Sequence, residues 1–391
     1  MKKETSVTTP FWRNTRIIPI ILQVIFVVIV IAASYYLLSN ALAGLKQLGI
    51  KLGFGFLENT ASFSIGETLI QYSAADSYSR AFLVGLTNTL RVAIIGVILA
   101  SVVGILVGIA KLSTNWLVSK IAEIYIEIFR NTPLLVQIFI WYFAVFLPLP
   151  RIENSLNLGS LFYFSNRGMA IPWFEKTSGS LIWFVFLIIG LVLAVIMWKL
   201  MIKRQVEGGK RTFPSLWSAG ALLFSFLVAF VMTLEAPLNL VLPTVEGKFF
   251  VGGYTVSPEF SAILVGLVIY TSTYIAEIVR AGILGVPKGQ VEAARALGVK
   301  NSTTLRLVIF PQAIRIIIPP VTSQYLNLIK NSSLAVAVGY PDLVSVGGTI
   351  LNQTGRAIEV IIIMIAVYLT FSLLTSLFMN YFNKKFQLVE R

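Results

Sequence analysis

The sequence predicts an all-α integral membrane protein with about eight transmembrane helices. Hydrophobic residues make up 57% of the 391 residues and charged residues only 12%, whereas soluble domains are roughly half apolar and a quarter charged. The mean hydropathy is +0.84. A membrane-spanning helix needs about 20 mostly apolar residues, and eight stretches meet this requirement: 17–38, 84–110, 117–148, 181–198, 216–235, 260–280, 314–338 and 357–380.

The absence of two residue types excludes whole classes of function. The chain has no Cys and no His, so it has no disulfides, no thiol or imidazole catalysis and no Cys/His metal site. We therefore predict no metal site. The net charge of +14 is better explained by basic cytoplasmic loops beside anionic lipid than by nucleic-acid binding.

The distribution of Lys and Arg predicts the orientation of the chain. If the N-terminus is inside, the loops on that side carry 20 basic residues and the opposite loops carry 8. Basic residues accumulate on the cytoplasmic side, so we expect both termini to be cytoplasmic. The first apolar run, 17–38, has 22 residues, which is long for a cleaved signal peptide, and we expect it to span.

The loop after the sixth span, 280–311, has an unusual pattern. Strong helix formers occupy 290–297, Gly298 interrupts them, and Asn301 and Ser302 can cap a second short helix that ends before Pro311. Ala293 and Ala294 are small enough to let a partner surface approach, and Glu292 offers a charge to it. An ordinary amphipathic juxtamembrane helix is the alternative.

This loop resembles the EAA loop of binding-protein-dependent ABC importers. The match consists of Glu292-Ala293-Ala294, three residues, Gly298, nine residues and Val308-Ile309-Phe310-Pro311, with Phe310 replacing the usual Leu. The resemblance implies that the loop forms a coupling helix docked in a groove of a cytoplasmic ATPase. The residues it implies for docking are Gln290, Glu292, Ala293, Ala294, Leu297 and Gly298.

Further blocks look like polar amino-acid permeases of the same family: 85–90, 130–137, 272–282, 328–334 and 339–343. The resemblance covers about 81–148 and 258–382, and it implies a five-helix permease core. The first span and the 149–257 insertion look like the longer permease of general L-amino-acid uptake systems. We thus divide the chain into 1–80 (span and external loop), 81–148 (first core part), 149–257 (inserted loops and a peripheral two-helix module) and 258–391 (second core part with the coupling loop).

The resemblance also implies the partners of the chain. They are a cytoplasmic ATPase dimer that holds ATP and Mg, a second permease that is a shorter sister, an external solute-binding protein, an amino-acid substrate and the bilayer of a bacterial inner membrane. No segment of the chain matches the P-loop pattern G-x-x-x-x-G-K-[ST]. Residues 208–212 resemble only the second half of that pattern. Without a P-loop, the chain is expected to bind no cofactor and to be no enzyme itself.

Ionisable and amide side chains inside the spans are candidate functional residues, because they are costly in lipid. Two helix-spaced pairs, Glu127–Arg130 and Glu277–Arg280, are predicted structural ion pairs. Thr132-Pro133 should break its helix, and Arg91 could extend to the outer interface. The candidate pathway residues are Arg130, Asn131, Gln137, Gln324, Asn327, Asn331 and Ser332, which could alternatively bond helices to one another.

Two other classes of function remain open at this stage. An ion-coupled secondary carrier for a small polar solute would show inverted repeats and matched acid-bearing broken helices, which the sequence does not display. The third class, a membrane-bound enzyme, is poorly supported, because the chain has no Cys and no His that could act in catalysis.

Overall fold

The computed structural model describes residues 17–47, 53–209 and 211–386. The charge count places the terminal segments 1–16 and 381–391 inside; residues 1–16 and 387–391 lie outside the described residues. The helices are α1 (Ile17–Gln47), α2 (Tyr78–Lys111), α3 (Trp116–Asn131), α4 (Leu134–Phe139), α5 (Ser180–Gly208), α6 (Pro214–Thr233), α7 (Pro258–Leu284), α8 (Lys288–Ala296), α9 (Asn301–Thr304), α10 (Phe310–Asn331), α11 (Leu343–Thr354) and α12 (Ala357–Phe386).

The helices agree with the predicted fold class. Among the described residues, seven helical segments are long and apolar enough to cross a membrane, and an eighth crossing results if the bent α3–α4 pair is one span. The predicted external loop 339–356 contains a helix, α11, that the hydropathy reading missed. Asp342 begins α11 by accepting a hydrogen bond from the Ser345 N–H at 2.8 Å, which is N-capping by a carboxylate.

The third span is sharply bent, as Thr132-Pro133 predicted. The axes of α3 and of the helix from Leu134 to Phe146 differ by 103°, and the second half ends in a π-helix, Ile140–Phe146. Gln137 lies at the bend, where its Nε2 donates to the Phe129 and Thr132 carbonyls at 2.7 and 2.9 Å. The Gln137 side chain thus bonds backbone carbonyls that have no helical partner at the bend. Unpaired backbone groups are costly within a membrane.

The helix that follows the coupling loop does not stop at Phe310-Pro311, so that prediction was wrong. α9, a π-helical turn (Leu305–Ile309), α10 and a 3₁₀ segment (Ser332–Val338) form one continuous helical stretch from Asn301 to Val338. Pro311 therefore lies in the interior of this stretch, although it is the second residue of α10. The wider π-helical turn directly before it absorbs the misfit of the ring.

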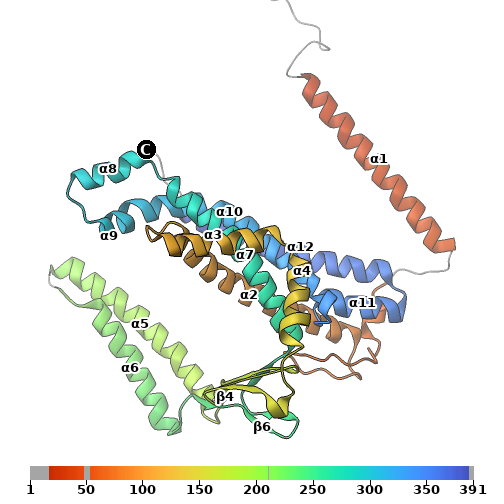
Figure 1. Cartoon of the computed structure of the whole chain (residues 1–391), viewed down its shortest axis with the longest axis horizontal. Coiled ribbons are helices and arrows are strands. Elements are labelled where there is room, and N and C mark those ends of the chain that lie inside the picture. Colours follow the sequence, from red (N-terminus) through yellow and green to blue (C-terminus); the bar gives the residue numbers. More distant parts are fainter. Residues whose placement is uncertain (1–16, 48–52, 210, 387–391) are drawn as a thin grey trace, which may run out of the picture.

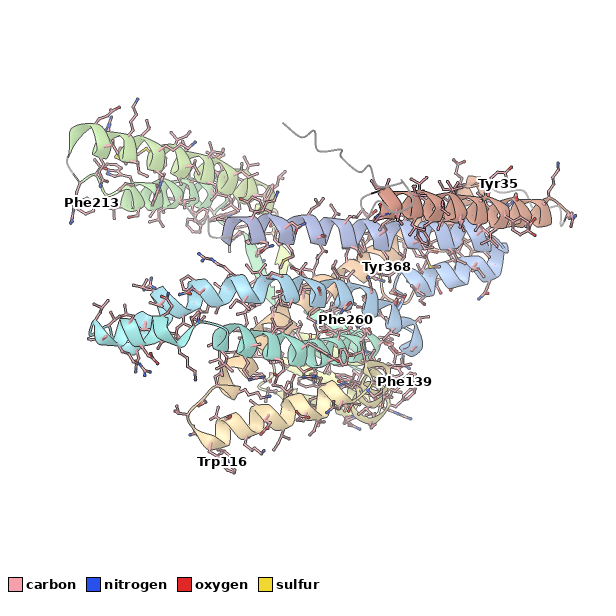
Figure 2. The ribbon with its side chains drawn as sticks, turned by 90° about the horizontal axis from the view of Figure 1, so that it is seen from above. Tyr35, Trp116, Phe139, Phe213, Phe260 and Tyr368 are labelled. Carbon is pink, nitrogen blue, oxygen red and sulfur yellow. The ribbon has the colours of Figure 1, made fainter. Side chains whose placement is uncertain are left out.

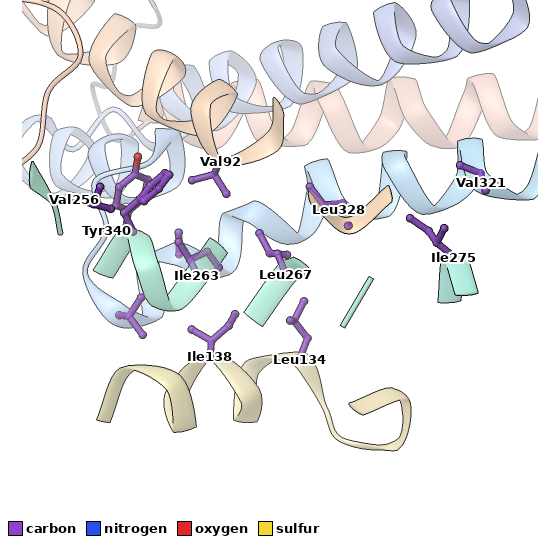
Figure 3. Packing of buried hydrophobic residues seen from close by; sticks show 14 of the residues in the cluster. Val92, Leu134, Ile138, Val256, Ile263, Leu267, Ile275, Val321, Leu328 and Tyr340 are labelled. Atoms are coloured by element: carbon purple, nitrogen blue, oxygen red, sulfur yellow. The ribbon is translucent and has the colours of Figure 1, made fainter. Parts of the chain in front are cut away.

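The core is centred on α2 and α7, with α4 and α10 packed against α7 (Figures 1 and 3). Ile138 and Leu134 of α4 face Ile263 and Leu267 of α7 (Figure 3). Glycines allow the close approach of the two central helices. A Cβ built on Gly104 would lie 2.6 Å from the Ile275 Cβ, which no real side chain tolerates.

The two loops predicted at 149–180 and 236–259 contain short strands. They are β1 (Leu156–Leu158), β2 (Phe162–Ser165), β3 (Gly168–Ile171), β4 (Trp173–Lys176), β5 (Leu238–Val241), β6 (Thr244–Glu246), β7 (Phe249–Val251) and β8 (Tyr254–Val256). All pairings are antiparallel: β1-β2-β3-β8 form one sheet, β4 pairs with β5, and β6 pairs with β7. Two further short 3₁₀ helices occur at Gly55–Glu58 and Ile152–Asn154.

α5 and α6 form a hairpin beside the main group of helices (Figures 1 and 2). The two helices touch where Gly190 meets Ser225, whose Oγ donates to the Phe186 carbonyl. Most of their other large apolar side chains, and those of α1, are exposed in the chain alone. Apolar helices with such surfaces require lipid or another apolar partner around them.

Gly108→Val should destabilise the protein by about 1–3 kcal/mol, the usual cost of overpacking. A Cβ at Gly108 would lie 2.7 Å from the Ala276 carbonyl oxygen of α7. Thermal unfolding of the purified protein in detergent measures the effect. Gly220→Val in α6 is the control, because nothing lies within 4 Å of a Cβ there. Equal melting temperatures for the two variants would contradict the α2–α7 contact.

Candidate functional site

The predicted coupling loop forms a short helix at one end of the molecule (Figure 1). Pro287 precedes α8, and Gly298 follows it with a φ of +69°. This left-handed conformation favours glycine, which accounts for the interruption that Gly298 makes in the run of helix formers. The Val299 N–H donates to the Ala294 carbonyl at 3.1 Å and closes the turn. Lys300 precedes α9 without a side-chain cap, so the predicted capping by Asn301 and Ser302 was wrong; both residues lie inside the helix.

Five of the six predicted docking residues are exposed: Gln290, Glu292, Ala293, Leu297 and Gly298. Leu297 is 82% exposed. Ala294 is buried against the chain itself. Ala293 and Ala294 are adjacent on a helix and point in different directions, so Ala294 does not share the exposed surface of the other five, and its docking role stays a prediction.

The base of the coupling loop is held by three charged side chains. Glu277 and Arg280 form the predicted ion pair, with 3.0 Å between Oε2 and Nη2. Lys111, the last residue of α2, pairs with the other oxygen of the same carboxylate. This contact joins the end of α2 to the C-terminal part of α7, the helix that precedes α8.

The predicted Glu127–Arg130 ion pair does not form. Glu127 instead accepts a hydrogen bond from Asn131 Nδ2 at 3.2 Å. The Arg130 guanidinium lies 5.9 Å from the ring centre of Tyr274 on α7, within the range of a cation–π contact. Arg130 and Asn131 are both exposed.

The candidate pathway residues on α10 fall into two groups. Gln324, Asn327 and Asn331 follow helical spacing on one face, where Asn327 is exposed and the other two are half-buried. Ser332 is completely buried, and its Oγ donates to the Ile329 carbonyl at 2.7 Å. Ser332 and the buried Gln137 both donate to backbone carbonyls of their own segments, and the buried Gln137 Oε1 has no hydrogen-bond partner among the described residues. Their place in the pathway stays a prediction.

Lys330 borders a separate cavity of about 540 Å³ between the end of α10 and α12. Its ammonium group shares this cavity with the polar side chains of Ser333, Tyr368 and Ser372. The remaining lining is apolar, and the cavity therefore has one cation in a mostly apolar wall.

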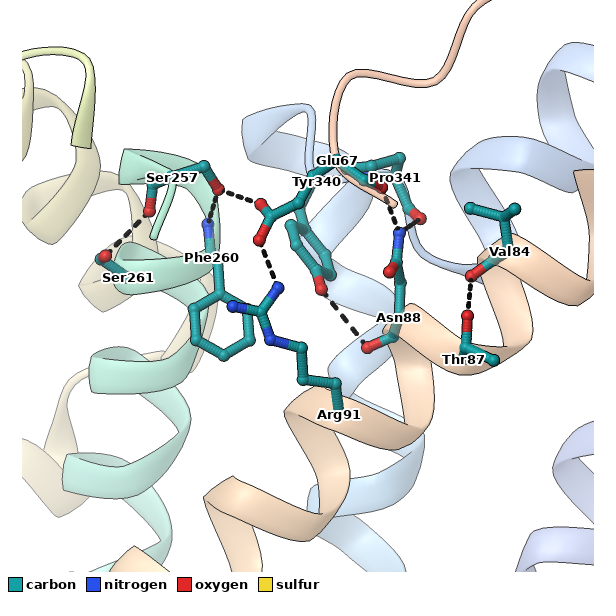
Figure 4. A network of polar contacts seen from close by, with 10 residues as sticks. All are labelled: Glu67, Val84, Thr87, Asn88, Arg91, Ser257, Phe260, Ser261, Tyr340 and Pro341. Atoms are coloured by element: carbon teal, nitrogen blue, oxygen red, sulfur yellow. Dashed lines mark hydrogen bonds and ion pairs between the residues drawn. The ribbon is translucent and has the colours of Figure 1, made fainter. Parts of the chain in front are cut away.

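A polar network at the other end of α2 was missed by sequence reasoning (Figure 4). Glu67, from the loop before α2, pairs with Arg91 and accepts a hydrogen bond from Ser257, the N-cap of α7. The Arg91 guanidinium also lies 3.8 Å from the ring centre of Phe260. The prediction that Arg91 extends to the interface was wrong. The available signal was that an arginine in a span needs a partner.

Asn88 extends this network towards α11. Its Nδ2 donates to the carbonyls of Glu67 and Pro341 at 2.8 and 2.9 Å. Beside it, the Leu343 N–H donates to the Thr89 hydroxyl at 2.9 Å. Burial raises the pKa of the neighbouring Asp342 carboxyl to about 7, because desolvation penalises the charged form.

Comparison with known proteins identifies the family. Residues 210–388 match the family described as "Binding-protein-dependent transport system inner membrane component". The chain is 48% identical to the general L-amino acid transport system permease protein AapQ of Rhizobium johnstonii, over 94% of this chain and 92% of that protein. The chain belongs to this family.

Two more relatives are similar over nearly their whole length. The putative amino-acid ABC transporter permease protein YhdX of Escherichia coli is 45% identical, over 94% of each chain. The glutamate/glutamine/aspartate/asparagine transport system permease protein BztB of Rhodobacter capsulatus is 38% identical, over 97% of this chain and 96% of that protein. The chain is thus a membrane permease component, and neither the secondary carrier nor the membrane-bound enzyme is supported.

Arg91→Met should destabilise the protein by about 3–5 kcal/mol, the cost of leaving one partner of a buried ion pair alone. The two side chains are only 8% and 17% exposed. Thermal unfolding in detergent tests this expectation. The double variant Glu67→Gln/Arg91→Met should be more stable than Arg91→Met, because it leaves no unpaired charge. A wild-type melting temperature for Arg91→Met would show that the network adds no stability.

Proposed function

We propose that this permease moves amino acids across the bacterial cytoplasmic membrane, driven by a separate ABC ATPase that docks on residues 287–311. The observation that carries the proposal is the exposed helix α8 with its glycine turn, which follows α7 three residues after the end of that helix. α7 itself is joined to the end of α2 by Lys111, Glu277 and Arg280. The amino-acid substrate is supported by the names of the three relatives.

The docking surface consists of Gln290, Glu292, Ala293, Leu297 and Gly298. Leu297 offers an apolar side chain to a groove, Ala293 and Gly298 allow close approach, and Glu292 offers a charge to an arginine. α8 is connected to α7 on one side and to the continuous α9–α10 stretch on the other. A displacement of α8 by the ATPase would therefore be transmitted to two core helices at once.

The remaining partners follow from the same proposal. ATP and Mg bind to the ATPase dimer and not to this chain. An external solute-binding protein delivers the amino acid, and a shorter sister permease pairs with this chain as a heterodimer. Both termini face the cytoplasm, which is supported by the 20 to 8 distribution of basic residues. Alternation between outward and inward access then moves the substrate past a site near the midplane.

The pathway in this proposal is lined by the polar face of α10 and the exposed end of α3. Gln324, Asn327 and Asn331 supply amide groups that can bond the carboxylate and the ammonium of an amino acid. Arg130 and Asn131 add exposed polar groups beside the 103° bend. Broken helices at such positions are a common feature of transport sites.

Glu292→Lys and Gly298→Asp should leave insertion into the membrane normal but abolish uptake and loosen ATPase binding. Losing the partner of a buried interfacial arginine costs about 2–5 kcal/mol. A side chain at Gly298 is strained by its φ of +69°. Labelled amino-acid uptake and pull-down of the ATPase measure the two effects.

Gly209→Asp is the matched control for the glycine variant. Gly209 also has a positive φ, of +62°, and nothing within 4 Å of a Cβ, but it lies in the α5–α6 link. We expect this variant to bind the ATPase as the wild type does. Normal ATPase recovery with Gly298→Asp and Glu292→Lys would mean that the docking site lies elsewhere.

A single cysteine at Asn327 should react with water-soluble thiol reagents, at a rate that changes when ATP binds. A cysteine at Ser332 should stay unreactive, because that position is completely buried. The chain has no native cysteine, so the labelling background is low. Failure of Asn327→Cys to react in every state would favour the alternative in which this face bonds another helix.

A further inference from the structure

The inserted segment between α4 and α7 contains a hollow of about 460 Å³ rich in positive charge. Its lining includes three basic side chains but only one carboxylate: Arg151, Ile152, Glu153, Asn166, Arg167, Lys248 and Phe249. We call this feature the basic hollow. Its charged groups sum to +2, so the hollow favours an anionic ligand.

Short hydrogen-bonded turns fix the backbone at each of the three cations. Arg167 stands in the two-residue turn between β2 and β3, where Ser165 pairs with Gly168. The Asn166 N–H donates to the Pro150 carbonyl at 2.9 Å, which ties this turn to the segment that carries Arg151. Lys248 stands in the turn between β6 and β7. The cations are therefore brought together from segments far apart in the sequence.

Contacts between the strands keep these turns in place relative to one another. The rings of Tyr163 on β2 and Phe250 on β7 lie 6.2 Å apart between centres, a distance typical of aromatic pairs. The 3₁₀ turn Ile152–Asn154 touches both β2 and β6. Because the turns are already fixed relative to one another, less conformational entropy is lost when a ligand binds to the three cations.

None of the cations is neutralised within the part of the chain that the structure describes. Arg151, Arg167 and Lys248 take part in no ion pair there, and neither does Glu153, although it lines the same hollow. The basic residues do not serve to hold the strands together by ion pairs. Their charges remain available to a group from outside the chain.

We propose that the basic hollow receives acidic side chains of a protein that docks from outside the membrane. The proposal rests on the proposed function, in which that partner is the external solute-binding protein. β8 leads into the N-terminus of α7, while the docking helix α8 follows its C-terminus. The basic hollow and the ATPase surface therefore belong to opposite ends of a membrane-crossing helix.

Two features favour a protein surface over lipid headgroups. Phe249, at the edge of the hollow, is 72% exposed and supplies the aromatic anchor that protein interfaces commonly use. Arg167 and Lys248 stand on hairpin turns between strands, and not at the ends of apolar helices, where headgroups contact membrane proteins.

The test compares the wild-type transporter with Arg151→Glu/Arg167→Glu/Lys248→Glu, each as the complete complex in phosphatidylcholine nanodiscs. The probe is the purified solute-binding protein that stimulates ATP hydrolysis by the wild-type complex. We expect the Kd of this protein to rise at least tenfold in the triple variant, because like charges then oppose one another. Added NaCl should weaken wild-type binding and have little effect on the triple variant.

Two single variants complete the design. Glu153→Lys should lower the Kd, since it removes the one negative charge from the hollow. Lys176→Glu, an exposed basic residue of β4 outside the hollow, should keep the wild-type Kd. Basal ATP hydrolysis and ATPase recovery at wild-type levels show that each variant is folded.

An unchanged Kd in the triple variant would overturn the inference. A change seen only in vesicles that contain phosphatidylglycerol would assign the hollow to lipid and would also overturn it. A wild-type complex that recovers no ATPase would refute the proposed function, an outcome separate from any effect of the hollow.

Discussion

The structure depends on the close contact between α2 and α7. Helices in lipid gain little from the hydrophobic effect when they associate, so they rely on van der Waals packing through small residues. Gly104 and Gly108 supply that approach, with Ile275 and Ala276 directly opposite. The other core helices also approach α2 and α7 closely at glycines. Gly266 of α7 contacts Ile138 of α4, Gly85 of α2 contacts α11, and Gly282 of α7 contacts Ile317 of α10.

This arrangement connects the proposed coupling loop to the core as a whole. α8 follows α7 after three residues, and α7 is held against α2 along its length and by Lys111 at its end. α10, which returns from the loop, packs on α7 near Gly282. In the proposed function, a displacement of α8 would therefore reach α7 and α10, which pack against each other.

Sequence reasoning recovered the features that depend on local chemistry. Apolar runs located the spans, Pro133 located the bend, and the left-handed turn required Gly298. It failed where a side chain's role depends on what the rest of the fold places beside it. Gln137 bonds carbonyls within its own bent segment, and Arg91 pairs with Glu67 from a loop whose path hydropathy does not specify.

The same limit explains the missed strands and the misplaced helix end. Strands of three or four residues are too short to show alternation, and two of their pairings, β3 with β8 and β4 with β5, join segments on opposite sides of the α5–α6 hairpin in the sequence. The stop predicted at Pro311 ignored the π-helical turn that precedes it. Ala294 was assigned by motif and Ser332 by its polar side chain; both are buried in this chain, and burial depends on tertiary packing.

The pairing of β4 with β5 closes the base of the α5–α6 hairpin. Lys176, four residues before α5, lies opposite Leu238, five residues after α6, so the two ends of the hairpin are one strand spacing apart, about 5 Å. A tight turn could bridge this gap if both helices were deleted. Because the hairpin adds an even number of crossings, α7 would still enter the bilayer from the same face. Deleting α5 and α6 together would therefore leave α7 and all later helices in their present orientation across the membrane.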